Sequence, residues 1–147
     1  RAIIPTIISQ ILKDPKKVKL GSLNHTRDFS YISDTVSAFV SALKSKKCIG
    51  ETINIGTGSE ISVKNLVYLI SKITNKKISV LSEKHRKRPK MSEVNRLCCS
   101  NNKAKKFLNW QPFYKGNPGM MRGLTKTIDW FSKPENLKKY QPKKFVI

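Results

Sequence analysis

The stretch GETINIGTGSEISV, residues 50–63, decides the fold class of this chain of 147 residues. Thr52–Ile55 is a short run rich in β-branched residues, which predicts a strand. Gly56-Thr57-Gly58 follows as a turn, and Ser62 then precedes apolar residues at helical spacing, as the N-cap of a helix does. A strand, a glycine turn and a helix in this order are typical of an α/β protein.

Periodic apolar residues predict further helices on both sides of this segment. We expect helices at residues 4–12, after an N-cap at Asp34, after Ser62, at 101–108 and from Pro118 to Phe131. The apolar stripe of the helix after Asp34 consists of Val36, Phe39, Val40 and Leu43. Short strands are expected at residues 18–20, 27–32, 52–55 and 77–81, a long basic loop at 82–99, and a weakly ordered tail from Lys133 onward. The pattern predicts a helix-rich α/β unit whose short strands cannot form a large sheet alone.

The chain is strongly basic, with 30 Lys and Arg against 9 Asp and Glu and a formal net charge of +21. Such a charge attracts polyanions, and nucleic acid is the first candidate. Lysine is however spread along the whole chain, and only residues 84–90 (KHRKRPK) are densely basic. The aromatic residues are not interleaved with the basic ones as base-stacking residues would be. We therefore interpret the charge as a composition bias and keep a nucleic-acid-binding module as an alternative function.

The cysteines and the apolar runs exclude several classes of site. Cys48, Cys98 and Cys99 have neither CxxC spacing nor a histidine at metal-ligand spacing, so we expect reduced thiols and no metal site. No apolar run approaches the roughly 20 residues that cross a bilayer, and the first thirty residues lack the regions of a signal peptide. We expect a soluble, cytoplasmic protein without a membrane partner.

Gly56-Thr57-Gly58 lies between a strand and a helix, where a dinucleotide-binding loop would lie. The third glycine position of that fingerprint is occupied by Ile61, whose branched side chain would obstruct close packing of helix and strand. We therefore interpret the segment as a tight turn and expect no cofactor-binding residues in this chain. We identify no catalytic residues either.

Four segments carry a family pattern in fixed order: RAIIPTIISQIL (1–12), KLGSLNHTRDFSYISD (19–34), GETINIGTGSEISV (50–63) and RPKMSEVNRLCCSNNKAKKFLNWQP (88–112). Together they resemble the C-terminal half of extended short-chain dehydrogenases that act on nucleotide sugars. Within that family RAIIP, RPKMSEV and the tail YQPKKFVI look most like UDP-N-acetylglucosamine or dTDP-glucose 4,6-dehydratases. Asn109 stands where the family usually has glycine, and asparagine tolerates the left-handed conformation of a helix end.

The resemblance implies that residues 1–132 form the C-terminal, substrate-binding lobe of a Rossmann-type enzyme, followed by a basic tail at 133–147. Residues 52–55 would be a strand of the Rossmann sheet of an upstream half that the chain lacks. The edge of this strand, and the apolar faces that would pack on the missing half, are then expected to be exposed.

The resemblance also implies binding residues for a UDP- or dTDP-sugar. Arg27 and Arg88 would close on the diphosphate, because planar guanidinium groups chelate two oxygens, and Arg86 is a possible substitute for Arg88. Asn54 would contact the same phosphates. The backbone of Leu20-Gly21 would meet the base, since glycine permits a close approach.

The activity implied is oxidation of the sugar at C4 by hydride transfer to NAD(P), followed by loss of water or by re-reduction. A cofactor loop and a Tyr-x-x-x-Lys acid/base pair would lie upstream, so we expect this fragment to be inactive alone and the complete enzyme to be a homodimer. Three alternatives stay open: the nucleic-acid-binding module, one half of a split enzyme, and a non-functional remnant.

Overall fold

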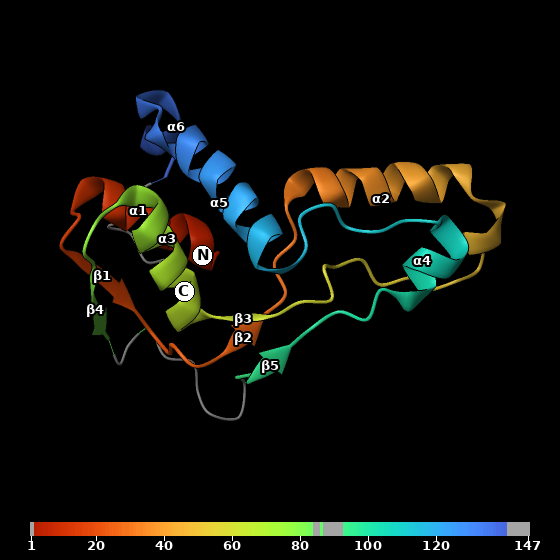
Figure 1. Ribbon diagram of the computed structural model, residues 1–147, viewed down its shortest axis with the longest axis horizontal. Coiled ribbons are helices and arrows are strands. Elements are labelled where there is room, and N and C mark those ends of the chain that lie inside the picture. Colours follow the sequence, from red (N-terminus) through yellow and green to blue (C-terminus); the bar gives the residue numbers. More distant parts are fainter. Residues whose placement is uncertain (1, 84–85, 87–92, 141–147) are drawn as a thin grey trace. The chain divides into compact units, whose positions relative to one another are not determined.

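The computed structural model describes residues 2–83, 86 and 93–140. In chain order the elements are α1 (Ile3–Lys13), β1 (Lys17–Leu20), β2 (Thr26–Arg27), α2 (Ile32–Lys44), the 3-10 turn η1 (Lys46–Cys48), β3 (Ile61–Ser62), α3 (Val63–Thr74), β4 (Ser79–Ser82), β5 (Arg96–Leu97), α4 (Asn102–Leu108), α5 (Gly116–Ser132) and α6 (Pro134–Lys138) (Figure 1). The five helices expected from apolar periodicity are all present, and the strands are as short as expected. The helix-rich α/β fold class is therefore confirmed.

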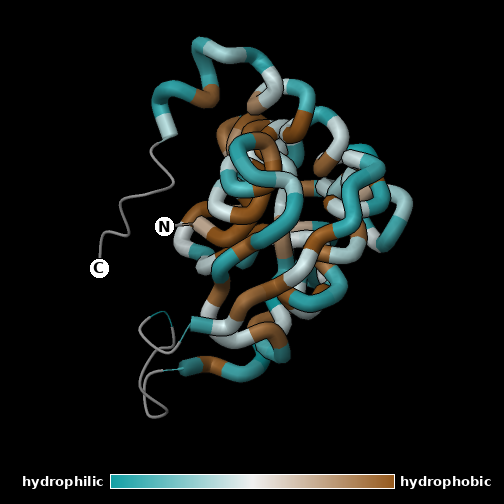
Figure 2. Tube along the Cα trace, turned by 90° about the vertical axis from the view of Figure 1, so that its left-hand side faces the viewer, coloured by the Kyte–Doolittle hydropathy of each residue, from teal (hydrophilic) through white to brown (hydrophobic). Residues whose placement is uncertain are grey.

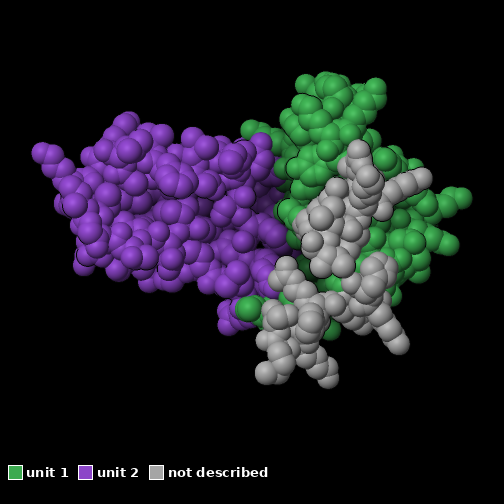
Figure 3. Space-filling view, turned by 180° about the vertical axis from the view of Figure 1, so that it is seen from behind, with its two compact units in different colours: residues 1–25, 62–95, 124–147 green, residues 26–61, 96–123 purple. Residues whose placement is uncertain are grey.

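The chain divides into two compact units, which Figure 3 distinguishes by colour. Unit 1 comprises residues 1–25, 62–95 and 124–147, and unit 2 comprises residues 26–61 and 96–123. Each unit therefore combines segments that are distant in the sequence, and each has its own set of buried side chains.

Unit 1 is built on two amphipathic helices and a parallel pair of strands. α1 and α3 pack together, and their inward positions are fully buried isoleucine and leucine side chains: Ile7, Ile8, Ile11, Leu66 and Ile70. The expected cap of α3 is confirmed, because the Ser62 hydroxyl accepts a hydrogen bond from the Asn65 N–H at 3.1 Å. The helix ends at Asn75, which adopts the left-handed conformation with φ of 51°.

β1 and β4 form the parallel pair, with Lys17 opposite Ser79 and Leu20 opposite Ser82. The two strands lie within two residues of the expected ranges 18–20 and 77–81. In β1 the side chains alternate, so that Val18 and Leu20 point into the core and the two lysines point outward.

The C-terminal segment contains more structure than the sequence led us to expect. Residues 134–138 form α6, with Pro134 in its first turn and Asn136 buried, where a weakly ordered tail was expected. The Asn136 side-chain amide donates to the Trp130 carbonyl, which ties α6 to the end of α5. Residues 133–140 are mostly hydrophilic, as the last coloured stretch of the tube before the C-terminus shows (Figure 2), and for this reason hydrophobic periodicity did not reveal the helix.

Unit 2 has a smaller core, centred on Trp110. Ala38 of α2, Ala104 and Leu108 of α4, and Trp110 are buried together, and Ile53 and Ile55 pack against them. The Trp110 indole N–H donates to the Ser37 hydroxyl at 2.8 Å. Asn109 ends α4 in the left-handed conformation, with φ of 50°, as expected for asparagine at this position.

Asp34 is not the N-cap of α2, which corrects the sequence-based expectation. The cap is Tyr31, and Asp34 lies within the first turn of the helix with only 3% of its surface exposed. Its carboxylate accepts hydrogen bonds from the backbone N–H groups of Phe113 and Tyr114, at 3.1 and 2.8 Å. The residue therefore fixes a distant segment onto α2, a role that local sequence patterns do not indicate.

The expected strand at residues 27–32 overlaps the observed β2, Thr26–Arg27, only at Arg27, and residues 28–31 are not in a strand. The Asp28 carboxylate accepts hydrogen bonds from the backbone N–H groups of Thr57, Gly58 and Cys99 and from the Thr57 hydroxyl, at 2.5 to 3.2 Å. β2 pairs in parallel with β5 immediately before this point, and the second sheet has the strand order β3-β2-β5. One carboxylate thus joins three segments of unit 2.

The expected strand at 52–55 is not formed. Its side chains alternate as a strand's would, with Ile53 and Ile55 half-buried against the core and Thr52 and Asn54 exposed. Within unit 2, whose residues are all described, no strand pairs with this segment. The alternation without a paired neighbour explains why the sequence pattern and the observed structure differ here.

We predict that Leu66→Ala lowers the free energy of unfolding by about 2 to 5 kcal/mol, because a fully buried leucine is replaced and a cavity is left. Tyr68→Ala is the matched control on the same helix, since Tyr68 is 66% exposed. Urea unfolding followed by circular dichroism measures both variants. Equal midpoints for the two would contradict the assignment of the core.

We predict that Asp28→Asn destabilises the chain by about 2 kcal/mol or more, because the amide keeps one acceptor but brings N–H groups towards the donors that the carboxylate served. Asp129→Asn, at an exposed position of α5, removes the same charge and should change stability by less than about 0.5 kcal/mol. Thermal unfolding of both variants is the measurement, and a shift that is the same for both would refute the role of Asp28.

Candidate functional site

The residues expected to bind the nucleotide sugar are distributed over both units. Leu20 and Gly21 lie at the end of β1 in unit 1, and Arg27 and Asn54 lie in unit 2. Arg88 lies outside the described residues.

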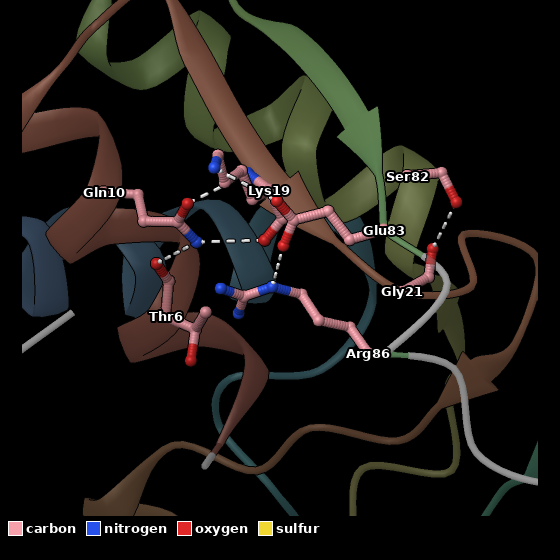
Figure 4. Close-up of polar contacts among 7 residues, drawn as sticks. All are labelled: Thr6, Gln10, Lys19, Gly21, Ser82, Glu83 and Arg86. Carbon is pink, nitrogen blue, oxygen red and sulfur yellow. Dashed lines mark hydrogen bonds and ion pairs between the residues drawn. The ribbon is translucent and has the colours of Figure 1, made fainter. Parts of the chain in front are cut away.

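In unit 1 the candidate site is the carboxyl end of the parallel pair β1 and β4. The Glu83 N–H donates to the Leu20 carbonyl at 2.8 Å. Figure 4 shows the second bond, in which the Ser82 hydroxyl donates to the Gly21 carbonyl at 3.2 Å. The Leu20-Gly21 backbone is thus held in one position. The carboxyl ends of parallel strands are where open α/β sheets bind their ligands.

Glu83 organises the charges at this end of unit 1. Its carboxylate forms an ion pair with the Arg86 guanidinium at 2.6 Å and with the Lys19 ammonium at 3.1 Å (Figure 4). The hydrogen bond from Arg86, together with that from Lys19, holds the pKa of Glu83 below its ordinary value. Arg86, the candidate substitute for Arg88, is thus engaged with Glu83, a residue that the sequence-based reasoning missed.

A signal for Glu83 does exist in the sequence. It is one of only nine acidic residues and stands three positions before Arg86, the spacing at which side chains meet in a helical turn. Gln10 of α1 adds a second restraint, because its side-chain amide bonds to both the N–H and the carbonyl of Lys19. These contacts fix the point from which the basic stretch 84–90 departs.

In unit 2 the candidate site is the end of β2. Arg27 is half-buried, and its guanidinium donates to the Thr26 carbonyl at 2.7 Å. The Thr26 hydroxyl donates to Glu60, which also forms an ion pair with Arg96 at 2.5 Å. Arg27 therefore projects from a strand that is fixed by its neighbours on both sides.

The glycine turn at 56–58 is held by Asp28. The N–H groups of Thr57 and Gly58, which a phosphate-binding loop would present to its ligand, already donate to this carboxylate. A Cβ atom at Gly56 would lie 2.3 Å from the Cβ of Cys99, so only glycine fits there. These contacts are those of a tight turn, as we inferred from Ile61 at the third glycine position of the fingerprint.

Burial, with smaller contributions from Asp28 and Cys98, raises the pKa of the Cys99 thiol.

A groove of about 460 Å³ in unit 2 is lined by four lysines, Lys44, Lys46, Lys47 and Lys106. It bears on the nucleic-acid alternative, because it is the place where lysines gather in this unit. The C-terminal ends of α2 and α4 also lie here, and lysines at such ends offset the partial negative charge of the last carbonyl groups. Helix-end compensation therefore accounts for this cluster without a bound polyanion.

The described part of the chain has neither a metal-ligating cluster nor a helix that could span a membrane. Among those residues, no three His, Cys, Asp or Glu side chains lie close enough together to hold a metal ion. None of the helices at residues 2–83, 86 and 93–140 has the length and apolar character needed to span a bilayer.

Comparison with known proteins places these features in a family. Residues 1–122 match the family model described as GDP-mannose 4,6 dehydratase. A putative UDP-glucose 4-epimerase from Methanocaldococcus jannaschii is 31% identical over 128 residues, which are 87% of this chain and 38% of that protein.

Two solved structures show the same relationship. An epimerase from Methanothermobacter thermautotrophicus superposes with a TM-score of 0.81 at 26% identity, covering 95% of this chain and 40% of its own. The UDP-glucuronic acid 4-epimerase from Bacillus cereus, solved with UDP-glucuronic acid and NAD, superposes with a TM-score of 0.76 at 28% identity, covering 94% of this chain and 40% of its own.

The chain thus spans about 40% of the length of these proteins. It belongs to the family described by the GDP-mannose 4,6 dehydratase model, the extended short-chain dehydrogenases that comprise nucleotide-sugar epimerases and dehydratases.

Proposed function

We propose that this chain is the substrate-binding part of an NAD-dependent nucleotide-sugar 4,6-dehydratase or epimerase. The observation that carries the proposal is the run RDFSYISD, residues 27–34, in which Asp28 joins three segments and Asp34 anchors a fourth. The contacts of Asp28 fix the backbone next to Arg27, in a chain that belongs to the family. The B. cereus relative, solved with a UDP-sugar and NAD, supports the substrate class.

The proposed diphosphate site lies beside the Asp28 carboxylate. Arg27 directly precedes Asp28, and Asn54 is three residues before Thr57, whose N–H and hydroxyl bond to that carboxylate. Arg27 and Asn54 therefore flank one hydrogen-bonded junction of unit 2. A guanidinium group binds two phosphate oxygens at once, and an exposed amide adds a neutral donor. Arg88 is proposed as the second diphosphate ligand from the basic stretch, for which Glu83 and Arg86 fix the point of departure.

The Leu20-Gly21 backbone is proposed to meet the base of a UDP- or dTDP-sugar. Both carbonyl groups are held by hydrogen bonds from β4 and the residue that follows it, so their position is set before a ligand arrives. Glycine lacks a Cβ and so permits the close approach of a planar ring to the backbone at Gly21. Preorganised backbone of this kind lowers the entropic cost of binding.

The remainder of the enzyme is proposed to supply the cofactor site and the acid/base residues. NAD, when bound there, accepts a hydride from C4 of the sugar. Residues 52–55 would then pair as a strand of the Rossmann sheet, and the complete enzyme, acting as a lyase or an isomerase, is proposed to be a cytoplasmic homodimer. This chain's own contribution is to bind and orient the sugar nucleotide.

We predict that Arg27→Ala, in the enzyme assembled with its cofactor-binding part, weakens binding of UDP-glucose roughly ten- to a hundred-fold, because a charged donor pair to the diphosphate is lost. Lys46→Ala is the matched control, since it removes the same charge from an exposed position of unit 2. Arg27→Lys should give an intermediate affinity, because it keeps the charge and loses the planar fork.

Isothermal titration with UDP-glucose and with dTDP-glucose measures these affinities. An affinity that is unchanged in Arg27→Ala would refute the diphosphate role. The nucleic-acid alternative has a different outcome: an oligonucleotide would bind with an affinity that falls steeply with salt, and the sugar nucleotides would not compete with it.

A further inference from the structure

Glu60 connects two neighbouring strands of unit 2 through their side chains. Its Oε2 atom accepts a hydrogen bond from the Thr26 hydroxyl of β2 at 2.8 Å, and its Oε1 atom accepts one from the Arg96 Nε–H of β5 at 2.5 Å. Thr26 and Arg96 lie opposite each other in the parallel pair of β2 and β5, which Figure 1 shows side by side. The carboxylate therefore bridges the two strands directly before Arg27.

The register of this pair places Arg27 on the face away from Glu60. Successive residues of a strand point to opposite faces, so Thr26 and Arg96 share one face, and Arg27 and Leu97 share the other. Glu60 binds on the first face, whereas the proposed diphosphate ligand leaves the strand on the second. A residue on the first face can influence Arg27 through the strand without touching a bound sugar nucleotide.

The link between Glu60 and Arg27 is Thr26. The Thr26 hydroxyl is held by Glu60, and the Thr26 carbonyl accepts a hydrogen bond from Nη1 of the Arg27 guanidinium at 2.7 Å. The direction of the guanidinium therefore depends on where this residue lies. Bidentate binding of phosphate oxygens requires a correctly aimed planar group, and a side chain that is oriented beforehand loses less rotamer freedom on binding.

The charge of Glu60 strengthens this link. The hydrogen bond from Thr26 and, after it, the hydrogen bond and charge of Arg96 outweigh the effect of burial and hold the pKa of Glu60 below its ordinary value. The carboxylate is therefore ionised at neutral pH and acts only as an acceptor, so the Thr26 hydroxyl donates to it. Hydrogen bonds to an ionised group are stronger than those between neutral groups.

A surface ion pair without a functional role is the alternative, because such pairs contribute little on their own. Glu51 and Lys103 form a pair of that kind in the same unit, at 2.8 Å and with 36% and 53% of their side chains exposed. Glu60 differs in that its second oxygen holds Thr26, the residue whose carbonyl holds Arg27. Glu51 is thus a control that is matched in side chain, charge and unit.

We propose that Glu60 is a positioning residue for Arg27: by holding Thr26 it sets the direction in which the Arg27 guanidinium meets the diphosphate. This inference rests on the proposed function, in which Arg27 binds the diphosphate. Glu60 itself does not contact the substrate. Its removal therefore weakens binding only through the contribution that Arg27 makes.

A double-mutant cycle on the affinity for UDP-glucose tests the proposal. Glu60→Ala, Arg27→Ala and the double variant are made in the enzyme assembled with its cofactor-binding part, and isothermal titration measures their affinities. We expect Glu60→Ala to weaken binding about three- to tenfold, but by less than about twofold in the Arg27→Ala background, because the group that it positions is then absent. Glu51→Ala should leave the affinity unchanged.

Thr26→Val distinguishes positioning from a general loss of stability. Valine keeps the branched shape of threonine and lacks the hydroxyl that Glu60 holds. We expect this variant to weaken UDP-glucose binding by a factor similar to that of Glu60→Ala. Thermal unfolding of every variant gives the fraction that is folded at the titration temperature, so that the affinities compared are those of folded protein.

An unchanged affinity in Glu60→Ala or in Thr26→Val would overturn the positioning role. An equal loss from Glu60→Ala with and without Arg27 would also overturn it, since Glu60 would then act elsewhere, and so would an equal loss in Glu51→Ala. In each of these cases the diphosphate role of Arg27 stands if Arg27→Ala alone weakens binding. If Arg27→Ala binds UDP-glucose as tightly as the unchanged enzyme, the proposed function fails and the positioning role fails with it.

Discussion

The Asp28 carboxylate is the interaction on which unit 2 depends. The strands of this unit are two residues long, too short for sheet pairing to fix three separate segments. Asp28 supplies the missing restraint by accepting hydrogen bonds from Thr57, Gly58 and Cys99, and charge-assisted bonds of this kind are stronger than those between neutral groups. The close approach of Cys99 then requires glycine at position 56.

Sequence periodicity identified the parts of the structure that depend on local chemistry. The cap at Ser62, the left-handed Asn109 and the five principal helices follow from side chains within a few residues of each other, and all are observed. The missed helix α6 lies in a polar segment, and another error concerns a long-range partner. Asp34 was assigned to the start of its own helix, whereas its carboxylate bonds to N–H groups 79 and 80 residues away, which no local pattern reveals.

The candidate site shows the same division. Arg27 and the Leu20-Gly21 turn were identified from the family pattern, and the structure adds the contacts that hold them: the hydrogen-bonded strand end at β2 and the Glu83 and Ser82 bonds at β4. Glu83 was missed because a chain with 30 basic residues offers many potential partners for each carboxylate. Only three-dimensional placement shows that this carboxylate joins Lys19 to Arg86 and so fixes the base of the basic stretch.

The two units differ in what their apolar residues do, and this difference bears on function. Unit 1 places its isoleucines and leucines inside, with Ile7 and Ile70 fully buried, so hydrophobic burial accounts for its shape. Unit 2 buries Trp110 and Leu108 with two alanines but leaves the large apolar side chains of α2 exposed, so hydrogen bonds to two carboxylates supplement its smaller core. A loss of the Asp28 contacts would therefore loosen unit 2 and the backbone beside Arg27 together, whereas unit 1 would keep its buried core.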